Sequence, residues 1–264
     1  MSPPAAGSEL AVDGLTIRFG GLIAVEGMSF EVREGEALSL IGPNGAGKTS
    51  AFNAITGYIQ PHGGTITYRG TRLNGLKPNR IAELGVVRTF QKTSVFMGQS
   101  VLDNVLLGLH LASKQRPLSV ILGLPSVARE EKALALEARR ILRFVELDAR
   151  STQLASALPY GELRLLEVAV ALAAKPKLLL LDEPVSGMNP AETQSFMNLL
   201  AKIRALGVTI LLVEHDMKMV MGVSDRVICL NHGRIIASGA PASIQRDPQV
   251  IRAYLGERYA RAQG

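Results

Sequence analysis

Two short motifs in the sequence carry the residue types that bind and cleave a nucleoside triphosphate. The first is GPNGAGKT, Gly42 to Thr49, which has the spacing of a phosphate-binding loop and lies between the apolar run ALSLIG and a segment with helical spacing. Its glycines allow successive backbone N–H groups to point at phosphate oxygens, and the following helix N-terminus adds positive potential. Lys48 can then reach the β- and γ-phosphates, and the Thr49 hydroxyl can bind Mg²⁺.

A pair of acidic residues supplies the second half of this chemistry. Asp182 and Glu183 follow four consecutive leucines, which predict a buried central strand. Both carboxylates should therefore emerge at the C-terminal end of that strand, where open α/β sheets bind their ligands. Asp182 can hold Mg²⁺ through water, and Glu183 can polarise a water toward the γ-phosphorus. Two acids after a strand can also be a helix cap, but together with Lys48 they predict an ATPase or a GTPase.

The elements that position these motifs alternate as a doubly wound parallel sheet requires. LAVDGLTIRF and IAVEGMSFEV predict two half-exposed antiparallel strands, and the apolar spacing from about residue 100 to residue 155 predicts a helical insert. A helix starting at about Glu162 and ending near Pro176, the strand KLLLLDEP, a helix from about Ala191 to Leu206 and the strand VTILLVEH follow. VICLNHGRIIASG predicts a pair of strands, and DPQVIRAYLG predicts a short helix. The expected fold class is therefore α/β.

Composition narrows the class of protein further. The 264 residues are long enough for one large domain. The net charge of +6 is scattered along the chain, so charge alone does not indicate a nucleic-acid partner. The single cysteine, Cys229, cannot form an intramolecular disulfide, which fits a reducing compartment and a buried apolar role. No apolar run reaches the roughly 18 residues that span a bilayer. The start MSPPAAGSEL lacks the features of a signal peptide, and we expect residues 1–9 and 258–264 to be a flexible lead and tail.

Further motifs follow in the order in which they occur in ATP-binding cassette (ABC) subunits, which this chain resembles. They are Phe19, Gln91 in VVRTFQKTSVF, LPYGE at 158–162, SGMNP after the acidic pair, and His215 in LLVEHDM. From about Leu10 to Glu257 the chain is most similar to the ATPase subunit of branched-chain amino-acid importers, on the stretches RFGGLIAVEGMSFEV, LIGPNGAGKTSAFNAITG, GVVRTFQ, DEPVSGMNPAET, EHDMKMVMGVSDRV and DPQVIRAYLGE.

The resemblance implies a P-loop NTPase fold of the ABC cassette type, with ATP and Mg²⁺ bound to it. It implies one domain over 10–257, in which a core with an antiparallel β-subdomain takes up about 10–92 and 160–257 and a helical subdomain about 93–160. The implied ATP-binding residues are Phe19, as a stacking partner of adenine, Val25, Gly42, Pro43, Asn44, Gly45, Ala46, Gly47, Lys48, Thr49, Ser50 and Gln91. The implied metal residues are Thr49, Gln91 and Asp182, and the implied catalytic residues are Lys48, Glu183 and His215. The implied signature is Leu158, Pro159, Tyr160, Gly161 and Glu162, and the implied D-loop is Ser186, Gly187, Met188 and Asn189.

The signature departs from the usual LSGGQ of the family. Pro159 stands where the family's serine binds the γ-phosphate held by a partner subunit. The proline therefore lacks one hydrogen bond to a charged acceptor, a loss of binding free energy on the order of 1.5 to 3 kcal/mol. Gly161 keeps its N–H, and the following helix still directs its N-terminus at the ligand. Asn189 replaces an aspartate that is common in the D-loop. We therefore expect two unequal ATP sites, the weaker one using LPYGE.

The resemblance also implies partners and a location. These are two transmembrane permease subunits, a second ATPase subunit in a head-to-tail dimer, either a paralogue or a second copy, and indirectly a periplasmic solute-binding protein. The chain would lie on the cytoplasmic face of the bacterial inner membrane, with no nucleic-acid partner. The alternatives are the same role in an importer of urea, amides or another small solute, and a soluble ABC ATPase associated with nucleic acid or ribosomes. The role of Arg116 to Val127 is left open.

Overall fold

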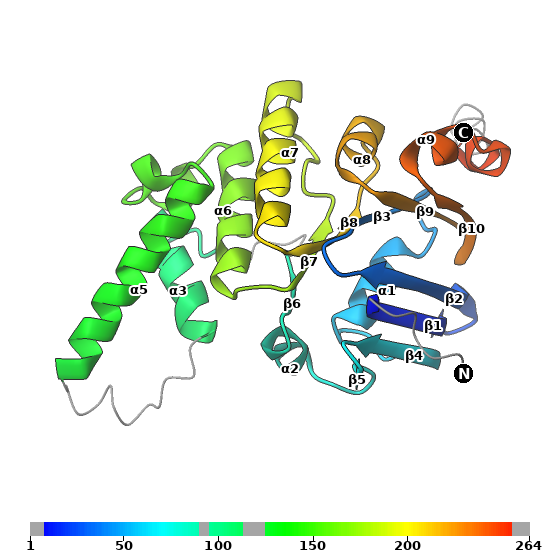
Figure 1. Ribbon diagram of the computed structural model, residues 1–264, viewed down its shortest axis with the longest axis horizontal. Coiled ribbons are helices and arrows are strands. Elements are labelled where there is room, and N and C mark those ends of the chain that lie inside the picture. The colour runs from blue at the N-terminus through cyan, green and yellow to red at the C-terminus, as the bar shows by residue number, and fades with distance from the viewer. Residues whose placement is uncertain (1–7, 90–94, 113–124, 255–264) are drawn as a thin grey trace.

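The computed structural model describes residues 8–89, 95–112 and 125–254, with the backbone alone at 112 and 125–130. Two sheets and a layer of helices make up this part of the chain (Figure 1). The main sheet has the strand order β10-β9-β3-β8-β7-β6, and it is parallel except for the β9–β10 pair. Its strands are β3 (Ala37–Ile41), β6 (Val86–Arg88), β7 (Leu178–Asp182), β8 (Thr209–Val213), β9 (Arg226–Asn231) and β10 (Arg234–Gly239).

The second sheet is antiparallel and has the order β2-β1-β4-β5. Its strands are β1 (Ser8–Phe19), β2 (Leu22–Arg33), β4 (Gly63–Tyr68) and β5 (Thr71–Arg72). Buried Glu9 ties this sheet to the main one, since its carboxylate accepts hydrogen bonds from Tyr68 and Arg69 and from the Thr209 hydroxyl of β8. The α/β class predicted from strand and helix alternation is confirmed, and so is the antiparallel sheet at the start of the chain.

Helices cover both faces of the main sheet. They are α1 (Lys48–Ile55), α2 (Pro78–Glu83), α3 (Val101–Ala112), α5 (Pro125–Phe144), α6 (Tyr160–Ala173), α7 (Pro190–Ala205), α8 (Met217–Val223) and α9 (Pro241–Gln245), with two short 3₁₀ turns, Asp148–Arg150 and Ala155–Ala157, before α6. Residues 248–254 are helical as well, and Asp247 caps them by accepting the N–H groups of Gln249 and Val250. In the described part of the chain no helix is long and apolar enough to cross a membrane.

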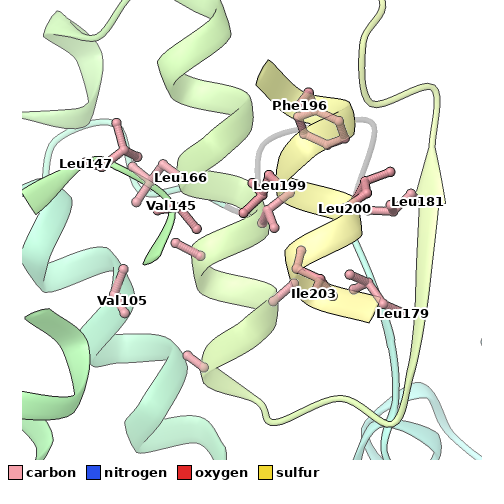
Figure 2. Close-up of a cluster of buried hydrophobic side chains, with 14 of the residues drawn as sticks. Val105, Val145, Leu147, Leu166, Leu179, Leu181, Phe196, Leu199, Leu200 and Ile203 are labelled. Atoms are coloured by element: carbon pink, nitrogen blue, oxygen red, sulfur yellow. The ribbon is translucent and has the colours of Figure 1, made fainter. Parts of the chain in front are cut away.

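The four leucines of β7 show how the core is divided. Because successive side chains of a strand point to opposite faces, Leu178 and Leu180 join the cluster with α1 and the antiparallel sheet, and Leu179 and Leu181 join the cluster with α7. Figure 2 shows the second cluster, where Leu200 and Ile203 of α7 lie toward Leu181 and Leu179 of β7, and Leu199 points toward α6. Leu166 of α6 lies beside Val145 and Leu147. The helices α3 and α5 pack on α6 in the same cluster, so the helical layer is continuous with one face of the sheet.

One detail of the fold differs from the sequence-based expectations. The helix expected to begin at about Glu162 begins at Tyr160, directly after Pro159, because proline is compatible with a helix start. Cys229 is fully buried in a third cluster with Val220, Ile244 and Val250, and burial raises the pKa of its thiol to about 11, as its apolar role predicts. The boundary expected at residue 160 between core and helical subdomain stays a prediction, while α6 packs with α3 and α5. Arg116 to Val127 lies almost wholly outside the described residues.

Candidate functional site

The carboxyl ends of four parallel strands meet at one edge of the main sheet. The neighbours β3, β8, β7 and β6 run in the same direction, and Leu40, Val213 and Asp182 lie at the same level in the ladder. The phosphate-binding loop leaves β3, His215 follows β8, and the acidic pair ends β7. Residues far apart in sequence are thus brought to the edge where open α/β sheets bind ligands.

The loop of Gly42 to Thr49 is curled around its own lysine. The Lys48 ammonium donates to the carbonyls of Gly42, at 2.6 Å, and Pro43, at 2.9 Å, and the side chain is buried. A Cβ on Gly42 would lie 2.1 Å from the Leu230 carbonyl oxygen, and the φ of 143° is open only to glycine. The loop therefore holds Lys48 at its centre, where the ammonium group can exchange backbone carbonyls for phosphate oxygens. Asn44 and Thr49 are exposed, and Ser50 is half-buried, around this centre.

Segments from both ends of the chain support the loop from behind. Val25 of β2 is fully buried, and its Cγ2 lies 3.1 Å from the place where a Cβ on Gly47 would be. Val25 therefore packs under the loop, and a direct contact with ATP stays a prediction. Gly233, in the β9–β10 turn, donates to the Ala46 carbonyl at 3.1 Å.

A second support, Tyr254, was not predicted from the sequence. The Gly42 N–H donates to the Tyr254 hydroxyl at 2.9 Å, which joins the helix at residues 248–254 to the first residue of the loop. The only signal for it was the tyrosine in the segment IRAYLGE, which carried the family resemblance.

Asp182 is held in place by a buried arginine that the sequence reading did not single out. The Arg88 guanidinium donates to Asp182 Oδ2 at 2.6 Å and to Asn53 Oδ1 of α1 at 2.6 Å. Burial raises the pKa of the Asp182 carboxyl, and the Arg88 charge and hydrogen bond oppose that rise. Arg88 thereby joins β6, β7 and α1 at one point. Its signal was weak, a charged residue at the end of a short apolar strand.

The other Asp182 oxygen is free to face a ligand. No group among the described residues donates to the buried Oδ1 atom. A buried polar atom without a partner is costly unless something binds it, so this oxygen fits a hydrated cation. Thr49, the other described residue of the predicted metal set, is exposed at the first turn of α1. Gln91, predicted for both ATP and the metal, lies outside the described residues.

Glu183 stands in a strained backbone conformation beside His215. Its φ of 48° lies in the left-handed region that non-glycine residues rarely adopt. Such outliers persist only where the surroundings determine them and are common at active sites. Its N–H donates to the Val213 carbonyl at 2.8 Å, which fixes the turn after β7. His215 Nδ1 lies 3.9 Å from Glu183 Oε1, and both side chains are partly exposed. The base and the histidine predicted from the motifs are thus neighbours.

The signature residues form the start of α6 and its approach. Pro159 is the N-cap and makes no side-chain cap, while Leu158 is buried and Pro159 and Tyr160 are exposed. Arg164 donates to the Tyr160 hydroxyl at 2.6 Å and lies over its ring, 5.0 Å from the centroid. Arg150 pairs with Glu162 at 3.2 Å. A tyrosine in the place of a flexible glycine is therefore fixed in orientation by its neighbour on α6.

The residues predicted as the D-loop lie directly against the predicted signature. A Cβ on Gly187 would lie 3.1 Å from Tyr160 Cε1, and a Cβ on Gly161 would lie 2.8 Å from Glu192 Oε1. Asn189 caps α7, since its side chain accepts the N–H groups of Ala191 and Glu192 and its own N–H donates to Glu192.

Two neighbours of Asn189 complete the D-loop. Ser186 and Met188 make backbone turns to Glu183 and Val185. Because its side chain caps α7, Asn189 has a structural role that an aspartate would also fill.

The signature and the phosphate-binding loop lie on different faces of the main sheet. Leu166 and Val168 of α6 belong to the cluster on the α7 face, while Phe52 and Ile55 of α1 belong to the cluster on the other face. Phe19 is 49% exposed at the end of β1, next to exposed Leu22 and Ile23, so its ring is available to stack on a ligand. The structure thus brings together Lys48, Asp182, Glu183 and His215 and separates them from the face that carries α6.

Comparison with known proteins agrees with this architecture. The chain matches the family model of the ABC transporter over residues 25–186 and that of the branched-chain amino acid ATP-binding cassette transporter over residues 234–260. The high-affinity branched-chain amino acid transport ATP-binding protein LivG of Salmonella typhimurium is 47% identical over 249 residues, which cover 94% of this chain and 98% of that protein. The probable LivG of Archaeoglobus fulgidus is 33% identical, covering 94% and 95%.

Solved structures agree as well. A crystal structure of the ADP conformation of an ATP-binding cassette of an ABC transporter has a TM-score of 0.83 and 29% identity, covering 94% of this chain and 99% of that one. A nucleotide-free ATP-binding cassette from an ABC transporter has a TM-score of 0.82 and 29% identity, covering 94% and 98%. The sheet order, the strand-end motifs and these matches lead to one conclusion: the chain belongs to the ABC transporter family, as one of its ATP-binding cassettes.

Proposed function

We propose that this chain binds and hydrolyses ATP to power an importer of branched-chain amino acids. One observation carries the ATPase part, namely that Lys48, Asp182, Glu183 and His215 come from three strand ends that meet at one edge of the main sheet. The cargo is supported by the LivG relatives, which are branched-chain amino acid transport ATP-binding proteins, and by the match to the branched-chain family model at residues 234–260. An importer of urea, amides or another small solute is the alternative, because nothing in an ATPase subunit touches the solute.

The chemistry follows from what each side chain can do at that edge. The loop N–H groups and Lys48 bind the β- and γ-phosphates, and the exposed ring of Phe19 stacks on adenine. Glu183 accepts the proton of the attacking water, and His215, 3.9 Å from it, donates to the γ-phosphate. Because hydrolysis is mostly positioning and charge stabilisation, the strained turn at Glu183 serves to orient the base.

Mg²⁺ fits the residues present and is part of the proposal. Thr49 and Asp182 would hold it together with Gln91, the Asp182 atom being the Oδ1 to which no described residue donates a hydrogen bond. When bound, the ion neutralises charge on the β- and γ-phosphates. Arg88, on the other oxygen of Asp182, fixes the direction in which Oδ1 points.

A second ATPase subunit is needed to complete each site. Since α6 packs on the face of the main sheet opposite α1, we infer that Gly161 and its neighbours serve an ATP held by a partner in a head-to-tail dimer, either a paralogue or a second copy. The site that uses Pro159 is then the slower of the two, because proline offers neither a hydroxyl nor an N–H.

The membrane partners are proposed from an exposed apolar surface that includes residues 96 and 97. Phe96, Met97 and Leu154 are 55%, 39% and 52% exposed. The Ser156 N–H donates to the Met97 carbonyl at 3.1 Å, which holds the two segments together. An exposed apolar patch that includes residues a few positions after Gln91 in the sequence suits a cytoplasmic segment of a permease. The chain then lies on the cytoplasmic face of the inner membrane, with two permeases and a periplasmic solute-binding protein as the rest of the importer.

Two experiments test these proposals separately. Glu183→Gln should retain ATP binding while hydrolysis falls by about 100-fold or more, because the amide cannot accept the proton; unchanged turnover would remove Glu183 from the role of base. For the cargo, cells that lack this chain should lose uptake of labelled leucine, isoleucine and valine and regain it with the wild-type gene but not with Glu183→Gln. Loss of urea or amide uptake instead would favour the alternative importer.

A further inference from the structure

Glu214 is a buried carboxylate at the catalytic edge that the mechanism above does not use. It follows the last residue of β8 and has an exposed fraction of 0%. A buried charge of this kind is costly unless hydrogen bonds satisfy it. Its two oxygens accept three backbone hydrogen bonds, and these come from two different loops.

One oxygen holds the loop after the catalytic base. Glu214 Oε1 accepts the Val185 N–H at 3.2 Å, and Val185 lies between Glu183 and the D-loop residue Ser186. The other oxygen holds the histidine loop. Glu214 Oε2 accepts the N–H groups of His215 at 2.8 Å and of Asp216 at 3.1 Å.

Asp216 extends this linkage into α8. Its own carboxylate accepts the Met219 N–H at 2.8 Å and caps the helix. A single rigid carboxylate therefore spans the base and D-loop segment on one side and the histidine and α8 on the other.

We propose that Glu214 is a positioning residue that couples His215 to the loop of Glu183 and the D-loop, so that neither can move without the other. The proposal rests on the proposed function, because it takes His215 as the group that contacts the γ-phosphate. Glu214 acts through these backbone groups and lies close to the His215 imidazole, whose Nδ1 is 3.8 Å from Glu214 Oε2. Since the D-loop also contacts the signature residue Tyr160, the linkage runs from His215 toward the surface that serves the partner's ATP.

Among side chains of this length, only glutamate can accept hydrogen bonds at both ends of its terminal group, from the Val185 loop and from the His215 loop. An ionised carboxylate is an acceptor at both oxygens, whereas a glutamine has one acceptor and one NH₂ group. Glu214→Gln keeps the size of the side chain but turns a donor toward one of the two loops, leaving at least one buried N–H without a partner. The substitution therefore breaks the linkage without creating a cavity.

The test is a double-mutant cycle on ATP hydrolysis by the full-length chain. Glu214→Gln should lower kcat by about 10- to 100-fold, as expected for a misplaced catalytic group, while KM for ATP changes by less than about threefold. In a chain that already carries His215→Ala, Glu214→Gln should change kcat by less than about twofold, because the two residues act as a unit. A loss that multiplies fully on top of His215→Ala would refute the linkage.

Glu36 offers a matched control. It is also a buried carboxylate that accepts a backbone N–H, that of Arg33, but it lies before β3 at the opposite end of that strand from the phosphate-binding loop. Glu36→Gln combined with His215→Ala should give the product of the two single effects. If the wild-type chain itself shows no ATPase activity, the proposed function is overturned, which is a different result from failure of the linkage.

Hydrogen exchange provides a readout that does not depend on hydrolysis. In nucleotide-free Glu214→Gln, the amides on at least one arm, either that of Val185 or those of His215 and Asp216, should exchange at least about tenfold faster, with those of α1 unchanged. Unchanged protection at all three would refute the proposal. If Glu214→Gln does not fold, Glu214→Asp provides a second test, because it keeps the charge but is too short to reach both loops. Its amides should lose protection on one arm only, and protection retained on both arms would also refute the proposal.

Discussion

The ion pair between Arg88 and Asp182 gives the sharpest test of how the site is built. Both side chains are buried, 6% and 0% exposed, and their closest atoms are 2.6 Å apart. Removing one partner from a buried pair leaves an uncompensated charge and costs about 3 to 5 kcal/mol. Arg88→Met, which keeps most of the side-chain volume, should therefore lower the free energy of unfolding by about that amount and the folding constant by more than about 100-fold.

A surface pair of the same length serves as the control. Arg80 and Glu83 are also 2.6 Å apart, but their side chains are 66% and 50% exposed. Exposed pairs contribute about 1 kcal/mol or less, because water screens both charges. Arg80→Met should therefore cost little, and since the two ion-pair distances are equal, the comparison shows that an ion pair of this length is not by itself sufficient for a large loss of stability.

The assay is urea unfolding in the absence of nucleotide and Mg²⁺. A loss of 3 kcal/mol moves the midpoint by about 1 M urea or more, since the slope is about 1 to 3 kcal/mol per molar. The double change Arg88→Met with Asp182→Leu should recover most of the stability, although not the activity, because no charge is left buried. If the double variant is no more stable than Arg88→Met alone, the loss comes from packing of Arg88 on the Phe52 ring, 5.6 Å from its centroid, and the reasoning is refuted.

Three further predictions concern the signature, the loop support and pH. Pro159→Ser should stabilise α6 by about 0.5 to 2 kcal/mol, because serine can cap a helix whose N-cap residue makes no side-chain hydrogen bond. In the assembled transporter the same substitution should raise ATP turnover; an unchanged turnover rate and ATP affinity would contradict the hypothesis of two unequal sites. Tyr254→Phe removes only the hydroxyl that accepts the Gly42 N–H, so it should lower the free energy of unfolding, measured by thermal unfolding, by about 1 kcal/mol and raise KM for ATP. An unaltered KM would mean that the helix at residues 248–254 does not influence the phosphate-binding loop. Burial raises the pKa of Glu36, but hydrogen bonds from Arg226 and the Arg33 N–H, together with the Arg226 charge, bring it below its ordinary 4.5. The stability that Glu36→Gln loses at pH 7 should therefore shrink as the pH falls from 4.5 through the lowered pKa; a stability difference from wild type that does not decrease below pH 4.5 would exclude this origin.

Much of the fold followed from local patterns in the sequence. The four leucines before Asp182 predicted a strand buried on both faces, and the structure divides them between two clusters. Glycine spacing and the lysine predicted the phosphate-binding loop, because that loop needs positive φ angles at fixed positions. The start of α6 was placed two residues late, since a helix boundary depends on Pro159 and on contacts with the D-loop as much as on apolar spacing.

The residues that hold the site in place were harder to predict. Arg88, Glu214 and Tyr254 each make contacts that join segments far apart in sequence or loops from different strands. A single arginine, glutamate or tyrosine beside an apolar run carries no local pattern that distinguishes a buried partner from a solvated one. Their roles follow only from the order of the strands, which decides which carboxyl ends are neighbours.

The sequence by itself determined the chemistry of this protein, because phosphate binding and proton transfer require particular residue types at particular spacings. Lys48, Asp182 and Glu183 could be named from their own motifs, and His215 from the ordered set of motifs that resembles ABC subunits. Tertiary structure decided the geometry: β8 lies between β3 and β7 and so delivers His215 and Glu214 beside the base, and α1 and α6 pack on opposite faces of the sheet. Strand order and the choice of face depend on long-range burial of apolar surface, and no short stretch of sequence records them.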